Sequence, residues 1–272
     1  QRALHLTYHG INDPEAIKRV FLDNAANYRR PGIVRRVLAP LAGQGLLNAE
    51  GEAWRAQRRM MAPEFSPAAV TAFTPLFVEV ARQAADRWAQ ADSDCVDMAA
   101  EATRTTLQVI DQALFSGQTE MPFEETADHV RAFLAGAAEV RLGLLLGLEA
   151  LDGGPTQRRA RAARRVMIDR MWAFINRRAD EPEPPEDFVT RLYRAFLKEN
   201  PRAEAMRLTL DNAMTFFVAG HETTSNAIAW ALYLLSRDRQ AQAWAHEEAV
   251  EAWAAGGTPE EILGRLPYLR MV

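Results

Sequence analysis

The chain has 272 residues, of which 48% are hydrophobic and 25% are charged, a balance typical of a globular core rather than a disordered segment. Its formal net charge of −4 argues against nucleic acid as a general partner. The single cysteine excludes an intramolecular disulfide framework and fits a reducing compartment, for which we expect the cytoplasm. The most apolar short run, residues 142–148, is far too short to span a bilayer, so no membrane span is expected.

Apolar periodicity and the positions of glycine and proline predict a chain made mostly of helices joined by loops. No linker rich in glycine and serine divides it, so one domain is expected. The first predicted elements, in chain order, are an internal strand at 4–8, a short helix at 13–25 capped by Asp13, and mostly loop at 29–48. A helix from 51 to 63, one long amphipathic helix at 67–88 and helices at 98–115 and 122–148 follow. After a break at 153–155, the sequence predicts an arginine-rich helix with a solvated face, an acidic proline turn at 180–187 and a core helix at 210–235.

The core helix at 210–235 carries a polar island at its centre, residues 221–226. The flanking residues are apolar almost all round, which predicts a helix buried on every side. Ala219, Glu222, Thr223 and Asn226 share one stripe of the helix. Gly220 removes a side chain beside this stripe, so that a flat ligand could approach the backbone. The Thr223 hydroxyl can bond the Ala219 carbonyl four residues back. A carboxyl and an alcohol in dry surroundings beside a groove are suited to proton delivery.

Three other interpretations of this helix are considered. A transmembrane helix would place six consecutive polar residues at the centre of the bilayer, at a high cost. A zinc peptidase helix needs His-Glu-x-x-His, but Ser225 stands where the second histidine belongs, and His246-Glu247 fails in the same way. An ordinary core helix whose polar groups are satisfied internally remains open.

A second group of polar residues lies in the helix that begins after Gly51. Trp54 and Arg58 are four residues apart on one face, and both side chains are pure donors. Two converging donors suit a carboxylate or a phosphate. The alternative is a basic surface helix with Trp54 packed inward, and taken alone the segment favours that alternative.

Together, the two groups resemble the cytochrome P450 family of heme-thiolate monooxygenases. The resemblance rests on Trp54-x-x-x-Arg58-Arg59 and on Ala219-Gly220-x-Glu222-Thr223-Thr224. Further segments resemble the same family in the same order, namely residues 27–29, 46–51, 232–235 and 265–272. The resemblance implies a mainly α, cytochrome P450-type helical fold that is incomplete here, with residues 1–272 as one partial domain without the heme-thiolate loop and most of the β-structure.

The resemblance also implies how the residues are used. Heme b would lie against Ala219 and Gly220, with its propionates bonded by Trp54 and Arg58. Thr223 would assist protonation of bound oxygen, and Glu222 would relay protons from solvent. One oxygen atom of O2 would enter a small organic, hydrophobic substrate that contacts the loop at 29–47 and the helices flanking Gly153. Electrons would come from a ferredoxin- or reductase-type partner that docks near Arg55 and Arg59.

The sequence departs from the family at both ends. The family's Glu-x-x-Arg helix and its glycine-rich cysteine loop would lie beyond Val272, so the iron-ligating cysteine is expected outside this chain. Cys95 stands in an acidic turn without a glycine-rich loop, and we interpret it as an incidental thiol. We therefore expect a fragment that is inactive by itself. The alternative is a non-catalytic helical remnant of the same fold, used for binding or as a scaffold.

Overall fold

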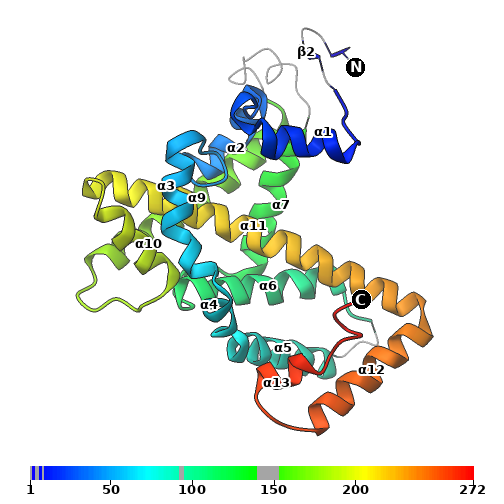
Figure 1. Ribbon diagram of the computed structural model, residues 1–272. Helices are drawn as coiled ribbons and strands as arrows, with labels where there is room; N and C mark the ends of the chain where they lie inside the picture. Colours follow the sequence, from blue (N-terminus) through cyan, green and yellow to red (C-terminus); the bar gives the residue numbers. More distant parts are fainter. Residues whose placement is uncertain (1, 4–5, 8, 92–94, 140–152) are drawn as a thin grey trace. The chain divides into compact units, whose positions relative to one another are not determined.

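The computed structural model describes residues 2–3, 6–7, 9–91, 95–139 and 153–272. It divides into two compact units, Gln1–Val37 and Leu38–Val272, and each is described by itself. Most of the described residues are helical, so the mainly α fold predicted from the sequence is confirmed (Figure 1). No helix in the described ranges is long and apolar enough to cross a membrane.

The first unit contains the only two strands of the described residues, both very short. Strand β1 (Arg2–Ala3) pairs antiparallel with β2 (Leu6–Thr7). The strand predicted at 4–8 is therefore present at Leu6–Thr7, whereas residues 4, 5 and 8 lie outside the described residues. Helix α1 (Pro14–Lys18) begins at Asp13, whose carboxylate accepts a hydrogen bond from the Ala16 N–H at 2.8 Å, as predicted.

The helical run after α1 changes its hydrogen-bond pattern before it ends. A π-helical turn covers Arg19–Asp23, and a 3₁₀ turn covers Ala25–Asn27. Instead of the single regular helix predicted at 13–25, the structure thus has an α-helical, a π-helical and a 3₁₀ segment in succession. The π-helical turn lets the Asn24 N–H reach the Arg19 carbonyl at 2.9 Å.

The prediction of mostly loop at 29–48 is wrong for Gly32–Ala42, which form helix α2. Apolar side chains at Ile33, Val37 and Leu41 recur every fourth residue and give the segment a helical stripe that outweighs its prolines. Pro40 lies in the last turn of α2, where a missing N–H removes only one bond of the helix.

The second unit contains the remaining helices. In chain order they are α3 (Gly51–Met61), α4 (Pro67–Thr71), α5 (Thr74–Ala89), α6 (Met98–Phe115), α7 (Phe123–Ala138), α9 (Pro155–Asp180), α10 (Phe188–Leu197), α11 (Arg202–Arg237), α12 (Arg239–Ala254) and α13 (Pro259–Gly264). The bounds predicted for α6, the break before Pro155, the arginine-rich helix and the acidic turn after Asp180 are confirmed. The predicted helix at 122–148 is described only as α7, and residues 140–148 lie outside the described residues.

The single helix predicted at 67–88 is interrupted between α4 and α5. Pro75 stands in the first turn of α5 and has no N–H to donate to the carbonyl four residues back, which belongs to Thr71. The Thr74 hydroxyl donates to that carbonyl instead, at 2.7 Å. The break therefore leaves the Thr71 carbonyl satisfied, and α5 starts in a new direction.

Helix α11 is the element around which the second unit packs. It contacts α6, α9 and α10 (Figure 1). The main core joins buried side chains of these helices, including Leu107, Phe115, Phe174 and Phe217. A smaller core lies where α3 and α10 meet the first turns of α11, around Met61, Leu192, Phe196 and Met206.

Helix α11 is not buried on every side along its length, so that prediction is wrong for its second half. Residues 211–215 are all buried, but Trp230, Tyr233 and Leu234 are 62%, 52% and 61% exposed. The apolar residues around the whole circumference of α11 are typical of a helix that has neighbours on every side. Within the described part of the chain, neighbours cover the second half on one side only.

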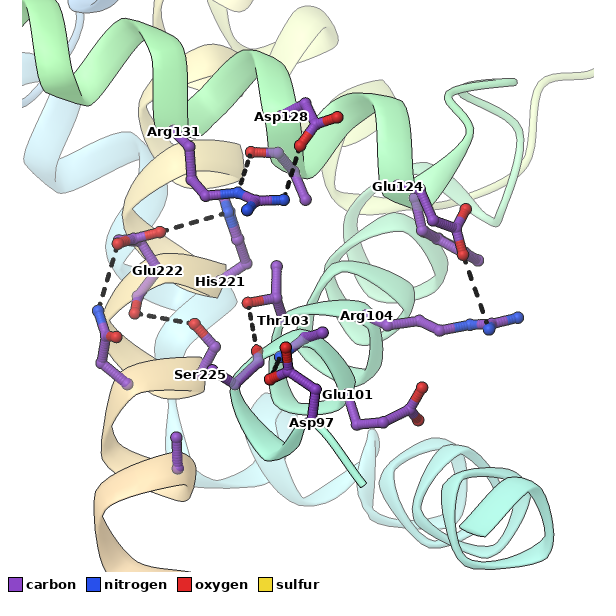
Figure 2. Close-up of a pocket in the computed structure, with 16 residues that line it drawn as sticks. Asp97, Glu101, Thr103, Arg104, Glu124, Asp128, Arg131, His221, Glu222 and Ser225 are labelled. Carbon is purple, nitrogen blue, oxygen red and sulfur yellow. Dashed lines mark hydrogen bonds and ion pairs between the residues drawn. The ribbon is translucent and has the colours of Figure 1, made fainter. Parts of the chain in front are cut away.

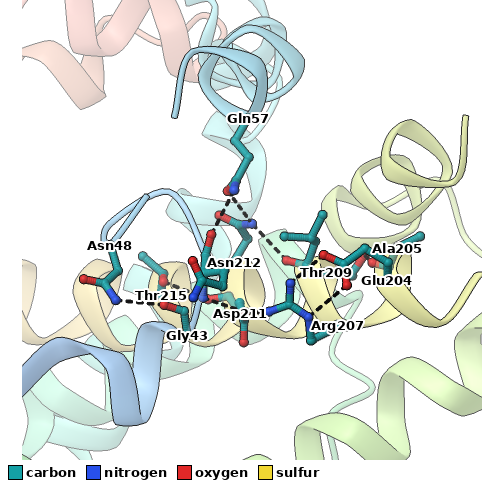
Figure 3. A network of polar contacts seen from close by, with 12 residues as sticks. Gly43, Asn48, Gln57, Glu204, Ala205, Arg207, Thr209, Asp211, Asn212 and Thr215 are labelled. Carbon is teal, nitrogen blue, oxygen red and sulfur yellow. Dashed lines mark hydrogen bonds and ion pairs between the residues drawn. The ribbon is translucent and has the colours of Figure 1, made fainter. Parts of the chain in front are cut away.

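Polar side chains of α11 hold the segment that leads into α3 (Figure 3). The Asp211 carboxylate accepts from the Gln44 N–H at 2.8 Å, and the Asn212 side-chain oxygen accepts from the Leu46 N–H at 2.8 Å. Gly43 has φ +47° and lies so close to the Asp211 carboxylate that a Cβ would collide with it. Burial raises the pKa of Asp211, while the Gln44 N–H and the Arg207 guanidinium oppose that rise.

The same network reaches α3 through Gln57. The Asn212 amide donates to the Gln57 side-chain oxygen at 3.0 Å, and Gln57 donates to the Gln44 carbonyl at 2.9 Å. Asn212 is fully buried, and its amide also donates to the Leu208 carbonyl at 2.9 Å. One side chain of α11 therefore joins the loop, α3 and its own helix.

Asn212→Ala in the full-length protein should lower the free energy of unfolding by about 2–4 kcal/mol. The Leu46 N–H and the Gln57 oxygen would be left buried without partners, at about 1–3 kcal/mol each. Urea unfolding measures the loss. Asn176→Ala is the matched control, because Asn176 is half-buried and bonds only the Trp172 carbonyl of its own helix. Equal losses in the two variants would contradict the bridging role of Asn212.

Candidate functional site

The predicted stripe of α11 lies on a side of the helix that the described residues leave open. Ala219, Thr223 and Asn226 are exposed, and Glu222 is half-buried. The Thr223 hydroxyl donates to the Ala219 carbonyl at 2.9 Å, so the bond predicted from the sequence is confirmed. The dry surroundings predicted for Thr223 are not observed, because no described element covers this side of α11.

Gly220 is explained by helix packing rather than by an open groove. A Cβ at Gly220 would lie 2.6 Å from Cδ1 of Ile110, so the space beside the glycine is filled by a side chain of α6. The open space beside Gly220 expected from the sequence is therefore not observed, since the missing side chain faces α6. The Gly220 carbonyl accepts from the Thr224 hydroxyl at 2.8 Å.

Glu222 lies between two polar neighbours of its own helix. Its Oε1 accepts from the Asn226 amide at 3.2 Å, and its Oε2 lies 3.8 Å from Nε2 of His221. The side chain is 35% exposed, so it reaches both solvent and the helix surface. A carboxyl in this position can exchange protons with water and turn toward either side of α11.

His221 is a residue whose role the sequence did not reveal. Its side chain is fully buried, and its Nδ1–H donates to the Phe217 carbonyl at 2.9 Å. Burial lowers the pKa of the imidazole, while the Phe217 carbonyl and Glu222 oppose the shift. In the sequence, His221 is the first residue both of the polar island at 221–226 and of an incomplete zinc motif. The feature of the sequence that could have indicated a role for His221 is its position next to Glu222 in an otherwise apolar helix.

A pocket of about 530 Å³ opens beside His221 and Glu222 (Figure 2). Its walls come from the beginnings of α6 and α7 and from the middle of α11. Most of its polar lining is charged, with Asp97, Glu101, Arg104, Glu124, Asp128, Arg131 and Glu222, and the lining also includes His221. Within the described residues, no group of three or more histidine, cysteine or acidic side chains could hold a metal ion.

Trp54 and Arg58 lie on the exposed side of α3. Trp54 is 42% exposed, so it is not packed inward as the alternative interpretation required. The opposite side of α3 carries Gln57 and Met61, which are buried. Among the described residues, neither the Trp54 indole N–H nor the Arg58 guanidinium has a hydrogen-bond or ion-pair partner. The structure therefore leaves these donors available to a ligand.

Arg58 and one apolar side chain of α11 border the same hollow. It lines a hollow of about 220 Å³ together with Leu46, Phe65 and Phe216, and Phe216 lies one helical turn before Ala219. A flat apolar group with carboxylates fits these surroundings, because apolar walls adjoin an unpaired guanidinium. The residues present are thus compatible with a heme. Cys95, the only cysteine, is exposed in the turn before α6.

Comparison with known proteins identifies the family of the chain. The cytochrome P450 family profile matches residues 3–272. Cytochrome P450 monooxygenase 205 of Postia placenta is 32% identical over 282 residues, which cover 92% of this chain and 52% of the relative. Cyclooctatin synthase of Streptomyces melanosporofaciens is 27% identical over 276 residues, which cover 100% of this chain and 58% of the relative. The chain spans about half the length of such curated relatives, and it belongs to the cytochrome P450 family.

Proposed function

We propose that the full-length protein is a heme-dependent monooxygenase that inserts one oxygen atom of O2 into an organic, hydrophobic substrate. The observation that carries the proposal is the adjacent pair Glu222 and Thr223 on a side of α11 that the described residues leave open. In the same unit, the described residues leave the donors of Trp54 and Arg58 on α3 without a partner. A core helix with satisfied polar groups would not need an exposed hydroxyl next to a half-exposed carboxyl. Membership of the family supports the reaction class.

Heme b, when bound, would supply the activation of O2 and the oxidising power. Trp54 and Arg58 would hold its propionates through N–H groups for which the described residues supply no acceptor. Ala219 would present a small side chain to the ring, and the backbone at Gly220 would support that surface. The Thr223 hydroxyl donates its hydrogen bond to the Ala219 carbonyl. Its oxygen can therefore still accept a hydrogen bond from a donor on the open side of α11.

Proton movement would depend on Glu222. Its carboxyl lies one residue before Thr223, and its half-exposed position lets it take a proton from water and release it beside the Thr223 hydroxyl. Positioned proton transfer contributes roughly 10²–10⁴-fold to the rate. We therefore assign Glu222 to proton delivery and Thr223 to holding the hydrogen bond that directs the proton.

The partners are proposed from the same residues. A ferredoxin- or reductase-type donor would dock near Arg55 and Arg59, which are exposed on α3. The substrate would contact residues 29–47 and the ends of α7 and α9 that flank Gly153. We also propose that residues 1–272 form one partial domain, with the iron-ligating cysteine beyond Val272, and that the single cysteine reflects a cytoplasmic location.

Arg58→Ala should weaken heme retention about tenfold or more, because a propionate loses a hydrogen bond from a charged donor, worth about 1.5–3 kcal/mol. Arg59→Ala is the matched control, since it removes the same charge from the next residue of α3 and should have a smaller effect. The rate of heme loss to a scavenger protein measures retention. Equal rates in wild type and Arg58→Ala would remove Arg58 from the heme site.

Thr223→Ala should retain heme and substrate binding but release more of the consumed reductant as hydrogen peroxide. Glu222→Gln should slow turnover by about 10²-fold, because an amide does not shuttle protons. The ratio of product formed to reductant consumed measures both effects. Thr224→Ala is the control, because it removes an equivalent hydroxyl that bonds the Gly220 carbonyl on a neighbouring face.

If these polar groups are only satisfied core residues, both variants should lose stability while the ratio of product to reductant stays unchanged. Such a result would contradict the catalytic roles. A full-length protein that binds no heme would favour the non-catalytic remnant instead.

A further inference from the structure

His221 has one ring nitrogen that nothing in the described part of the chain satisfies. Its Nε2 is completely buried and has no hydrogen-bond partner. The other nitrogen, Nδ1, lies 2.9 Å from the Phe217 carbonyl, which can only accept, so Nδ1 carries the hydrogen. Burial lowers the pKa of the ring and keeps it neutral near pH 7. Nε2 therefore carries a lone pair and needs a donor.

The nearest charged group to Nε2 is unsuitable as that donor when it is ionised. Oε2 of Glu222 lies 3.8 Å away, which is too long for a direct hydrogen bond, and an ionised carboxylate only accepts. Two acceptors that face each other at this distance can share one water, which donates one hydrogen to each. The pair thus has the geometry of a water site.

The pocket beside the pair has room for such water and reaches solvent. It measures about 530 Å³, and a water occupies roughly 30 Å³ in the liquid. Its outer wall carries Asp97, Glu124 and Asp128, which are exposed, and its inner wall carries His221. Nε of Arg104, which also lines the pocket, is a second buried polar atom without a partner in the described residues.

The charged groups around the pocket are mostly engaged with one another. On α7, Arg131 pairs with Asp128 at 2.7 Å, and Arg104 of α6 pairs with Glu124 at 3.6 Å. Glu101 accepts from Arg87 and Trp88, at 3.2 and 3.0 Å. Asp97 accepts from the Ala100 N–H at 3.0 Å, at the start of α6. None of these bonds reaches Nε2 of His221.

Helix geometry places Glu222 between the pocket and Thr223. Successive residues of an α-helix are turned by about 100°, so His221 and Thr223 lie on opposite flanks of Glu222. His221 faces the pocket between α11 and α7 (Figure 2), whereas Thr223 is exposed on the other flank. A carboxyl that turns between these flanks connects them.

We propose that His221 is a positioning residue, whose Nε2 anchors a water that bonds Glu222 and supplies it with protons from the pocket between α6, α7 and α11. The inference rests on the proposed monooxygenase function and extends it to the path of the protons. Each transfer moves one proton along hydrogen bonds from pocket water to Glu222, and solvent returns it to the water. No electron or further reactant is involved.

The neutral buried ring has a consequence for stability. The unfolded chain binds a proton at His221 as the pH falls below about 6.5, while the folded protein does not until its lowered pKa is reached. Between these two pKa values the unfolded state binds more protons than the folded state. The free energy of unfolding should therefore decrease as the pH is lowered through this window. His221→Phe should show a weaker fall, which unfolding curves at pH 5–8 measure. An unchanged pH dependence would show that the ring is not buried and neutral.

The test compares His221→Phe, which keeps a ring without nitrogen, with His221→Gln, which restores a polar acceptor. Both are made in the full-length, heme-loaded protein. His221→Phe should lower the product-to-reductant ratio and turnover about tenfold and increase the solvent deuterium isotope effect, with heme content unchanged. His221→Gln should recover to within about threefold of wild type. His129→Phe, the same change on α7 outside the pocket, should behave as wild type.

A crystal structure supplies a readout that is independent of activity. Wild type and His221→Gln should hold a water within hydrogen-bond distance of residue 221 and Glu222, and His221→Phe should lack it. Thr103→Leu narrows the pocket from α6 and leaves His221 itself unchanged, and it should reproduce the loss of turnover even if His221→Phe does not fold.

The possible results separate the two proposals. If the wild-type protein forms no O2-dependent product, the monooxygenase function fails. If the wild type is active but His221→Phe and Thr103→Leu keep its coupling and isotope effect, the proton path is wrong. Equal losses in His221→Phe and His221→Gln, accompanied by equal losses of thermal stability, would reduce His221 to a packing role and overturn the inference.

Discussion

The position of α3 depends on two side chains of α11 that satisfy backbone N–H groups of the preceding segment. Asp211 and Asn212 bond the N–H groups of Gln44 and Leu46, each at 2.8 Å. A buried N–H left without an acceptor costs about 1–3 kcal/mol, so this segment has few alternative positions of similar energy. Because α3 follows within a few residues, its exposed donors are carried to a defined place beside α11.

The conformation of Gly43 belongs to the same constraint. Its positive φ turns the chain at the end of α2, and its lack of a side chain admits the Asp211 carboxylate. Any larger residue would be strained by the backbone angle and would also collide with Asp211. The polar network, rather than apolar burial alone, therefore determines how the segment that leads into α3 packs against α11.

The hydroxyl groups of α11 show why a local bond is a weak indicator of function. Thr209, Thr215 and Thr223 each donate to the carbonyl four residues back, at 2.7, 2.8 and 2.9 Å. Thr209 and Thr215 are buried, whereas Thr223 is exposed. The bond itself is common to all of them, so exposure beside Glu222 distinguishes Thr223, and exposure is a tertiary property.

The sequence by itself determined the family motifs, the mainly helical character of the chain and the bounds of α6, because these depend on residue types and on local periodicity. It also determined that Thr223 can bond Ala219, since that contact lies within one helical turn. The sequence could not show that the space at Gly220 belongs to Ile110, a residue of another helix, or that α2 forms despite Pro40.

Only the tertiary structure decided which flank of α11 is open and which is covered. Among the described residues, it placed His221 beside α6 and α7 and left Nε2 without a partner, and it left Trp54 and Arg58 exposed. These features depend on contacts between residues far apart in the chain, and helical periodicity reports only that a face is apolar, not which neighbour covers it.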